Sequence, residues 1–205
     1  RKLGLSSRET MQVAQKLYEK GMITYMRTDS MFLSEQAVKA AREAILKLYG
    51  KTYLPAEFRD YGKKKVKGAQ EAHEAIRPAG TEFIHPDEAG LSGIEAKLYD
   101  LIWKRTMASQ MVNSEHKQVT ARLGVGDAIF GASGMTVEFP GFLKAYVESS
   151  DDGKSENEET KLPQLKKGDK IGLIKLETFE HETKPPARYT EASLVQILEK
   201  EGVGR

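Results

Sequence analysis

A tyrosine and an arginine stand two positions apart in the segment GMITYMRTDS, residues 21–30. Tyrosine can form covalent intermediates, but its protonated phenol attacks poorly at neutral pH unless a positive charge or a base lies close by. Arg27 is permanently charged, and its planar guanidinium can bind two phosphate oxygens at once. In an extended segment, Tyr25 and Arg27 would point to the same face. The pattern fits attack by Tyr25 on a phosphodiester that Arg27 holds.

The same tyrosine has a simpler interpretation. Near a helix end, a tyrosine is most often a half-buried packing residue whose hydroxyl bonds to the backbone. An ordinary turn, however, would use Asn, Gly or Pro, because those residues suit turn dihedral angles. The spacing of Tyr25 and Arg27 alone leaves the nucleophile and the packing residue both open.

A histidine lies in a second segment, AQEAHEAIRP, residues 69–78. Glu71, Glu74 and Arg77 lie near His73, which is consistent with a structural histidine bonded to a carboxylate. The other interpretation is a histidine that orients a substrate or relays a proton, because imidazole changes its charge near neutral pH. We interpret the nearby basic run GKKKVKG as a solvated loop, since it has no interleaved aromatic residue for stacking on nucleic-acid bases.

Three segments together resemble the type IA DNA topoisomerases. ITYMRTDS, residues 23–30, resembles their active-site tyrosine motif, and residues 69–78 resemble their histidine motif at about the expected separation. KPPARYTEASLVQILEKEGVGR, residues 184–205, resembles the part of the family that leads toward a Pro-Ser-Thr-Tyr sequence. The segments follow the family's order and are spread over most of the chain, from residue 23 to residue 205. Met26, between the tyrosine and the arginine, is more similar to the motif of bacterial topoisomerase I than to that of topoisomerase III or reverse gyrase. Topoisomerase III tends to have proline at this position.

The resemblance implies a role for each matching residue. Tyr25 would be the nucleophile that forms a 5′-phosphotyrosine link while a 3′-hydroxyl leaves. Arg27 would contact the scissile region, and His73 would lie near the active site. The other matching residues expected to bind DNA or support the active site are Thr28, Asp29, Arg188 and Arg205.

The resemblance also implies a reaction and its partners. The complete enzyme would be an isomerase that cleaves single-stranded segments of negatively supercoiled DNA and relaxes the supercoils by strand passage. It would need no ATP, because the tyrosyl link keeps the energy of the phosphodiester, and the chain has no GxxxxGK[ST] loop. The family uses Mg²⁺ held by a Toprim domain with a D-x-D-x-E pattern, which this sequence lacks. We therefore expect a central fragment with no metal site, inactive without the other domains of its polypeptide.

Capping and stop signals predict the helices. Ser6 and Glu9 form a capping box for a first helix, which Gly21 ends. A second helix spans residues 35–49, and a capping box of Ser92 and Glu95 opens a third that lasts to about residue 111. A fourth follows the Pro185-Pro186 pair. The apolar residues at helical spacing in the first three are Met11, Ala14, Leu17, Tyr18, Val38, Ala41, Ile45, Leu48, Leu98, Ile102 and Trp103.

From about residue 115 the pattern alternates with a period of two. KQVTARLGV, AIFGASG, MTVEF, FLKAYVE and the long DKIGLIKLETFEHE therefore predict antiparallel strands. The expected fold class is α+β and multidomain. A helical cap domain, helix-turn-helix-like, spans residues 1–111. A partial β-rich hinge domain spans residues 112–180 with an acidic loop at 148–160, and residues 181–205 begin a further helical domain. By the resemblance, these are parts of the type IA topoisomerase toroid.

Composition limits the other possibilities. The 205 residues are 39% hydrophobic and 30% charged, and the net charge is only +2, so any binding of nucleic acid must depend on local charge. The absence of cysteine excludes disulfides and thiolate chemistry and fits a cytoplasmic protein. No apolar run approaches the roughly 18 residues of a membrane span, so we expect no membrane partner.

Two other classes of function remain open from the sequence. The helices near residues 8–20 and 35–49 are compatible with a non-catalytic DNA-binding module of the helix-turn-helix type, although the connection is long. Alternatively, the chain is a structural fragment and Tyr25 belongs to its core. Within the family, topoisomerase III and reverse gyrase are the alternatives to topoisomerase I.

Overall fold

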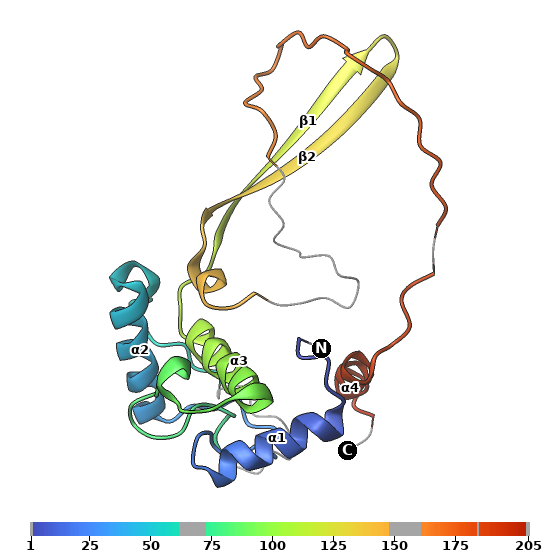
Figure 1. Ribbon diagram of the computed structural model, residues 1–205. Helices are drawn as coiled ribbons and strands as arrows, with labels where there is room; N and C mark the ends of the chain where they lie inside the picture. The colour runs from blue at the N-terminus through green and yellow to red at the C-terminus, as the bar shows by residue number, and fades with distance from the viewer. Residues whose placement is uncertain (1, 62–72, 148–160, 184, 204–205) are drawn as a thin grey trace. The chain divides into compact units, whose positions relative to one another are not determined.

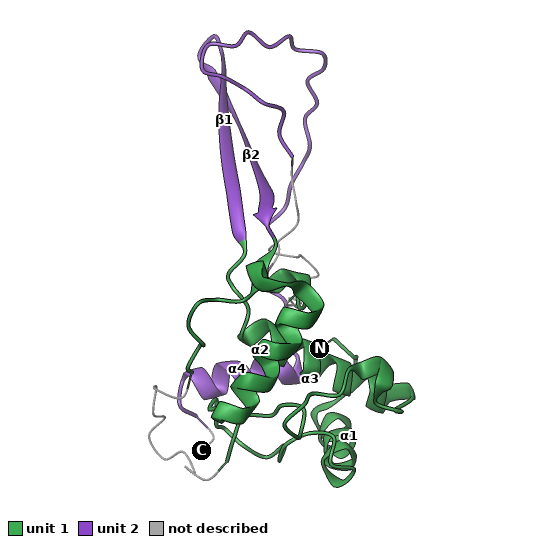
Figure 2. Cartoon of the chain, turned by 90° about the vertical axis from the view of Figure 1, so that its left-hand side faces the viewer, with its two compact units in different colours: residues 1–114, 140–149 green, residues 115–139, 150–205 purple. Residues whose placement is uncertain are grey.

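Two compact units make up the chain in the computed structural model (Figure 1). The described residues are 2–61, 73–147, 161–183 and 185–203. Figure 2 colours the first unit, residues 1–114 with 140–149, separately from the second, residues 115–139 with 150–205. The chain is thus an α+β fragment, as expected, while the expected domain boundaries near residues 111 and 180 stay a prediction.

The first unit is helical and the second holds the sheet. The first contains α1 (Ser7–Glu19), α2 (Glu35–Tyr49) and α3 (Gly93–Ser109), with short 3-10 turns at Lys51–Tyr53, Pro86–Glu88 and Gly141–Lys144. The second contains the strands β1 (Glu115–Val125) and β2 (Ala128–Phe139) and the helix α4 (Glu191–Lys200). No helix in the described part of the chain has both the length and the apolar character needed to cross a membrane.

Both ends of α1 are fixed by local hydrogen bonds. The Ser6 hydroxyl accepts from the Glu9 N–H, and the Glu9 carboxylate accepts from the Ser6 N–H, which confirms the capping box. Gly21 has a φ of 67°. Its N–H donates to the carbonyl of Tyr18 at 2.8 Å, and the N–H of Met22 donates to the carbonyl of Leu17 at 2.9 Å. This is a complete Schellman motif, so the chain leaves α1 in a defined direction.

The start of α3 differs from its prediction. Ser92 precedes the helix, but its side chain makes no capping hydrogen bond. The expected capping box with Glu95 is therefore wrong. The Glu95 carboxylate pairs instead with the ammonium of Lys20, next to the end of α1. A charged ammonium is a stronger partner for a carboxylate than a backbone amide is, so the contact between helices replaces the local cap.

The core of the first unit lies between α1, α2 and α3. Leu17, Ile45 and Trp103 are all at most 2% exposed, which confirms them as core residues. Tyr99 is also buried and donates its hydroxyl to the carbonyl of Ile84 at 2.8 Å. Burial raises the pKa of Tyr99 to about 12. Three residues predicted on the apolar stripes are instead exposed: Met11, Tyr18 and Leu48.

The second unit has fewer strands than the sequence predicts. β1 and β2 form one antiparallel hairpin in which Leu123 pairs with Phe130, and AIFGASG and MTVEF merge into β2. Residues 142–148 are predicted as a strand but begin within a 3-10 turn. Residues 169–182 form no strand in the described structure, and Leu173 and Ile174 are exposed. Alternation reports strand propensity, but a strand also needs a neighbour for its backbone hydrogen bonds.

Gly141 lies where the chain returns from β2 to the first unit. Its φ is 49°, and a Cβ there would lie 2.2 Å from the carbonyl oxygen of Asn113. The next residue, Phe142, donates its N–H to the carbonyl of Val112 at 3.0 Å. Residues 112–113 and 141–142 therefore pack backbone against backbone, and only glycine fits.

We expect Gly141→Ala to lower the free energy of unfolding by about 3 kcal/mol, from left-handed strain plus overlap with Asn113. Gly90→Ala is the matched control, because Gly90 has a φ of 64° but an added Cβ would meet nothing within 4 Å. It should cost about 1 kcal/mol. Urea unfolding followed by the fluorescence of Trp103 measures both. Equal losses would contradict the close approach at Gly141.

Candidate active site

A short antiparallel contact joins the tyrosine motif to the histidine segment. Ile23 forms an isolated bridge with Pro78, and the Thr24 N–H donates to the carbonyl of Arg77 at 2.9 Å. Ile23 is 2% exposed, so the bridge is anchored in the core. Two segments that lie far apart in the sequence are thereby held side by side.

The Thr24 side chain completes this connection. Its hydroxyl donates to the carbonyl of Ala75 at 2.7 Å and accepts from the N–H of Arg77 at 3.0 Å. One hydroxyl therefore satisfies two backbone groups of the histidine segment. Both groups are part-buried, where an unpaired polar group is costly.

These hydrogen bonds bring the side-chain rings of Tyr25 and His73 into contact. Their ring centroids lie 5.2 Å apart, with an angle of 35° between the ring planes. Tyr25 is half-buried and packs against the edge of the core. Its ring also contacts Tyr18 of α1, at a centroid distance of 5.4 Å and an interplanar angle of 69°. The phenol ring thus contacts aromatic side chains from two other parts of the sequence, α1 and the histidine segment.

The charged residues beside His73 bond elsewhere. The Arg77 Nε lies 2.6 Å from a Glu74 carboxylate oxygen, and Arg77 is only 8% exposed. Burial raises the pKa of Glu74, but hydrogen bonds from Arg77 and Ser34 outweigh it and hold the pKa below its ordinary value. Ser34 is the N-cap of α2. Glu74 therefore links Arg77 to the start of α2.

The residues after Tyr25 have different environments. Met26 is buried at 4% exposure, whereas Arg27 and Asp29 are exposed. The chain bends at Met26 and Arg27, so the extended geometry that would align Tyr25 with Arg27 does not apply here. Thr28 accepts the N–H of Ser30 at 3.0 Å, which shapes the turn. Within the described residues, the Arg27 guanidinium makes no hydrogen bond or ion pair.

The remaining expected site residues belong to the second unit or lie outside the described residues. Arg188 is exposed and belongs to the second unit. Arg205, Glu71, the basic run at 62–68 and the acidic loop at 148–160 lie outside the described residues. Among the residues that are described, no three acidic or histidine side chains come together as they would to hold a metal ion.

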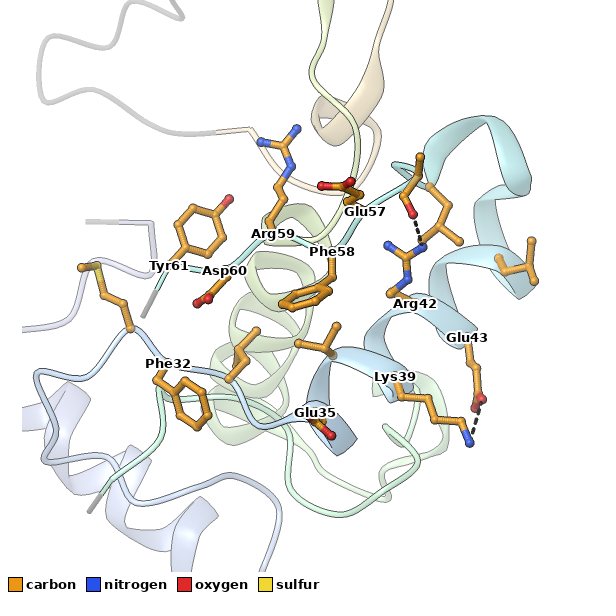
Figure 3. Close-up of a pocket in the computed structure, with 16 residues that line it drawn as sticks. Phe32, Glu35, Lys39, Arg42, Glu43, Glu57, Phe58, Arg59, Asp60 and Tyr61 are labelled. Carbon is orange, nitrogen blue, oxygen red and sulfur yellow. Dashed lines mark hydrogen bonds and ion pairs between the residues drawn. The ribbon is translucent and has the colours of Figure 1, made fainter. Parts of the chain in front are cut away.

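Two hollows in the described part of the first unit lie apart from the candidate site, since neither is lined by Tyr25 or His73. The larger, of about 1050 Å³, lies between α2 and residues 54–61 (Figure 3). Figure 3 shows Phe32 and Phe58 there among charged side chains of both signs. Lys39 and Glu43, one turn apart on α2, form an ion pair at 3.9 Å. Such a mixed lining does not favour one charge of ligand.

The sequence motifs identify Tyr25 and His73 but not the residues that hold them in place. In the sequence, Thr24 and Glu74 stand out only as polar neighbours, and Tyr18 only as an apolar helix position. No local signal marks their roles, because Thr24, Glu74 and Tyr18 each contact a residue that is seven or more positions away: Ala75, Ser34 and Tyr25, respectively.

We expect Thr24→Val to lower the free energy of unfolding by about 2 kcal/mol, because two part-buried backbone groups lose their partner. Thr24→Ser keeps the hydroxyl and should cost less than about 1 kcal/mol. Urea unfolding measures both, and hydrogen exchange at the Arg77 amide reports the local effect. Unchanged exchange in the valine variant would contradict the role of this hydroxyl.

The lowered pKa of Glu74 predicts a pH dependence of stability. Its folded pKa lies below the ordinary value of 4.5, so its contribution is complete above that value and is lost as the pH falls below it. Glu74→Gln should lower the free energy of unfolding by roughly 1.5 kcal/mol at neutral pH. The difference from the parent should shrink toward about pH 3. Urea titrations at both pH values test this, and a constant difference would rule out the charge as the cause.

Comparisons with known proteins identify the family. The model of the DNA topoisomerase family matches residues 1–205. The DNA topoisomerase 1 of Synechocystis sp. is 58% identical and that of Streptomyces coelicolor 55% identical over all of this chain. The chain spans only 23% and 22% of their lengths.

A solved structure agrees with these sequence matches. Full-length topoisomerase I from Thermotoga maritima matches with a TM-score of 0.71 and 35% identity, over 100% of this chain and 33% of that one. The family that the tyrosine and histidine motifs indicated is confirmed. The chain belongs to the DNA topoisomerase family.

Proposed function

We propose that this chain is the tyrosine-bearing part of a type IA topoisomerase I, which relaxes negatively supercoiled DNA without ATP. The observation that carries the proposal is the backbone pairing that holds Tyr25 against His73. Both residues stand at the family's motif positions, and the pairing joins those two motifs in one place. The complete polypeptide carries the activity, because the chain is 23% of the length of its Synechocystis relative.

The reaction is a transesterification at a phosphodiester of single-stranded DNA. The phenol oxygen of Tyr25 attacks phosphorus, the bond from phosphorus to the 3′ oxygen breaks, and the phenol proton leaves as the 3′ oxygen gains one. The product is a 5′-phosphotyrosine link and a free 3′-hydroxyl. The reverse reaction reseals the strand, and neither direction needs ATP because one phosphate ester replaces another.

Each residue of the site has a physical task in this step. Arg27, exposed and without a partner among the described residues, binds the phosphate oxygens. His73 lies within contact of the Tyr25 ring and orients the phenol or relays its proton. Thr28 shapes the turn that presents Arg27, through its bond to Ser30. Asp29 supports the active site, and in the second unit the exposed Arg188 contributes a positive charge for DNA binding.

The rest of the parent polypeptide completes the enzyme. In this proposal the first unit is the helical cap domain and the strands belong to the β-rich hinge domain. Both domains form part of the family's toroid, which opens to let a DNA strand pass. The enzyme acts in the cytoplasm. Mg²⁺ would be held by a Toprim domain elsewhere in the polypeptide, where it would assist cleavage. The residues described here bring no three acidic or histidine side chains together to hold that ion.

The helix-turn-helix alternative is less well supported. In that motif a turn of about three or four residues joins the two helices. Between α1 and α2, residues 20–34 instead carry the tyrosine motif and pair with the histidine segment. Residues 20–34 therefore contribute to the candidate site and are not the short turn of a helix-turn-helix motif.

The experiment traps the covalent adduct between the complete parent enzyme and end-labelled single-stranded DNA under denaturing conditions. Tyr25→Phe should abolish the adduct with folding nearly unchanged, because only a hydroxyl is removed. Arg27→Lys keeps the charge but loses the two-pronged grip on phosphate, so a slower adduct should form. An adduct in the phenylalanine variant would show that Tyr25 is not the nucleophile.

A further inference from the structure

Tyr18 occupies an unusual position for an apolar residue of α1. It follows Leu17, which is completely buried, yet Tyr18 itself is 41% exposed. It is not part of the buried core, nor of the partly buried shell that packs on that core. Its ring packs against Tyr25 in an edge-to-face arrangement, at 5.4 Å and 69°. The side chain is placed on the candidate nucleophile rather than in the core.

We propose that Tyr18 is a positioning residue that holds the ring of Tyr25 in the orientation needed for attack. The inference rests on the proposed function, in which Tyr25 is the nucleophile. Tyr18 and His73 both contact the Tyr25 ring, so the phenol is restrained by contacts from α1 and from the histidine segment. This assigns to α1 a part in catalysis that its amphipathic pattern does not suggest.

A restraint of this kind matters because Tyr25 is only half-buried. A tyrosine ring moves by rotation about two side-chain bonds, and a small rotation near the backbone displaces the distant hydroxyl. Attack on phosphorus requires the oxygen in line with the leaving group, and misplacement by about 1 Å can cost roughly a hundredfold in rate. Edge-to-face packing is a preferred geometry for aromatic pairs, so Tyr18 favours one orientation of Tyr25.

The backbone fixes the distance between the two tyrosines. The carbonyl of Tyr18 accepts the N–H of Gly21, and that of Leu17 accepts the N–H of Met22. Thr24, directly before Tyr25, is bonded to the histidine segment. Both ends of the short segment between Tyr18 and Tyr25 are therefore held, and ring packing does not depend on a loose turn.

The ring of Tyr18, rather than its hydroxyl, carries this role. The hydroxyl makes no hydrogen bond to any residue that the structure describes, whereas the ring contact is direct. Tyr18→Phe should therefore preserve the effect, and Tyr18→Leu should remove it. Because Tyr18 lies outside the core, the leucine variant should fold and melt like the parent.

The test measures single-turnover adduct formation by the complete parent enzyme at saturating end-labelled single-stranded DNA. Tyr18→Leu should slow adduct formation about three- to tenfold, with unchanged DNA affinity and melting temperature. Tyr18→Phe should react at the parent rate. Tyr61→Leu is the matched control, since Tyr61 is 42% exposed and bonds through its hydroxyl to the carbonyl of Ser109, and it should also react at the parent rate.

Three results would overturn the inference: a parent rate for Tyr18→Leu, an equally slow Tyr18→Phe, or a rate loss that follows a lower melting temperature. Tyr25→Phe in the same assay separates the two proposals. A covalent adduct in the Tyr25→Phe variant would contradict the proposed function itself. If Tyr25→Phe gives no adduct but Tyr18→Leu reacts normally, only the role of Tyr18 fails.

Discussion

The candidate site depends on the hydrogen bonds of the Thr24 hydroxyl. It bonds to the carbonyl of Ala75 and the N–H of Arg77, residues more than fifty positions along the chain. The segments that it joins supply the phenol and the imidazole, and neither forms a helix or a named strand in its described part, residues 21–30 and 73–78. The site therefore forms only when the whole helical unit folds and brings them together.

Buried residues on both sides of Tyr25 explain how a half-exposed side chain can be held precisely. Ile23 and Met26 are 2% and 4% exposed and fix the backbone in the core. Tyr25 lies between them and keeps part of its ring accessible. The nucleophile that we propose must reach a long polymer and so has to lie at the surface. Its position is set by the anchored backbone and by ring contacts rather than by an enclosing cavity.

The sequence predicts what local chemistry decides and fails where distant partners decide. The capping box of Ser6 and the stop at Gly21 are confirmed because their bonds close within a few residues. The capping box of Ser92 is wrong, and Glu95 pairs instead with Lys20, directly after the end of α1. The strand expected over residues 169–182 is absent from the described structure for the same reason, since alternation cannot supply a pairing partner. Likewise the motifs indicate Tyr25 and His73, but nothing local indicates Tyr18.

The two arginines of the motifs lie in opposite environments. Arg77 is 8% exposed and bonded to Glu74, whose carboxylate stays ionised because Arg77 and Ser34 stabilise it. Its charge is thus neutralised inside the unit, where a lone buried cation would be unfavourable. Arg27 is exposed and has no ion pair within the described residues. In the proposed function, Arg27 is therefore the arginine that is free to bind a phosphate, while Glu74 holds Arg77 inside the unit.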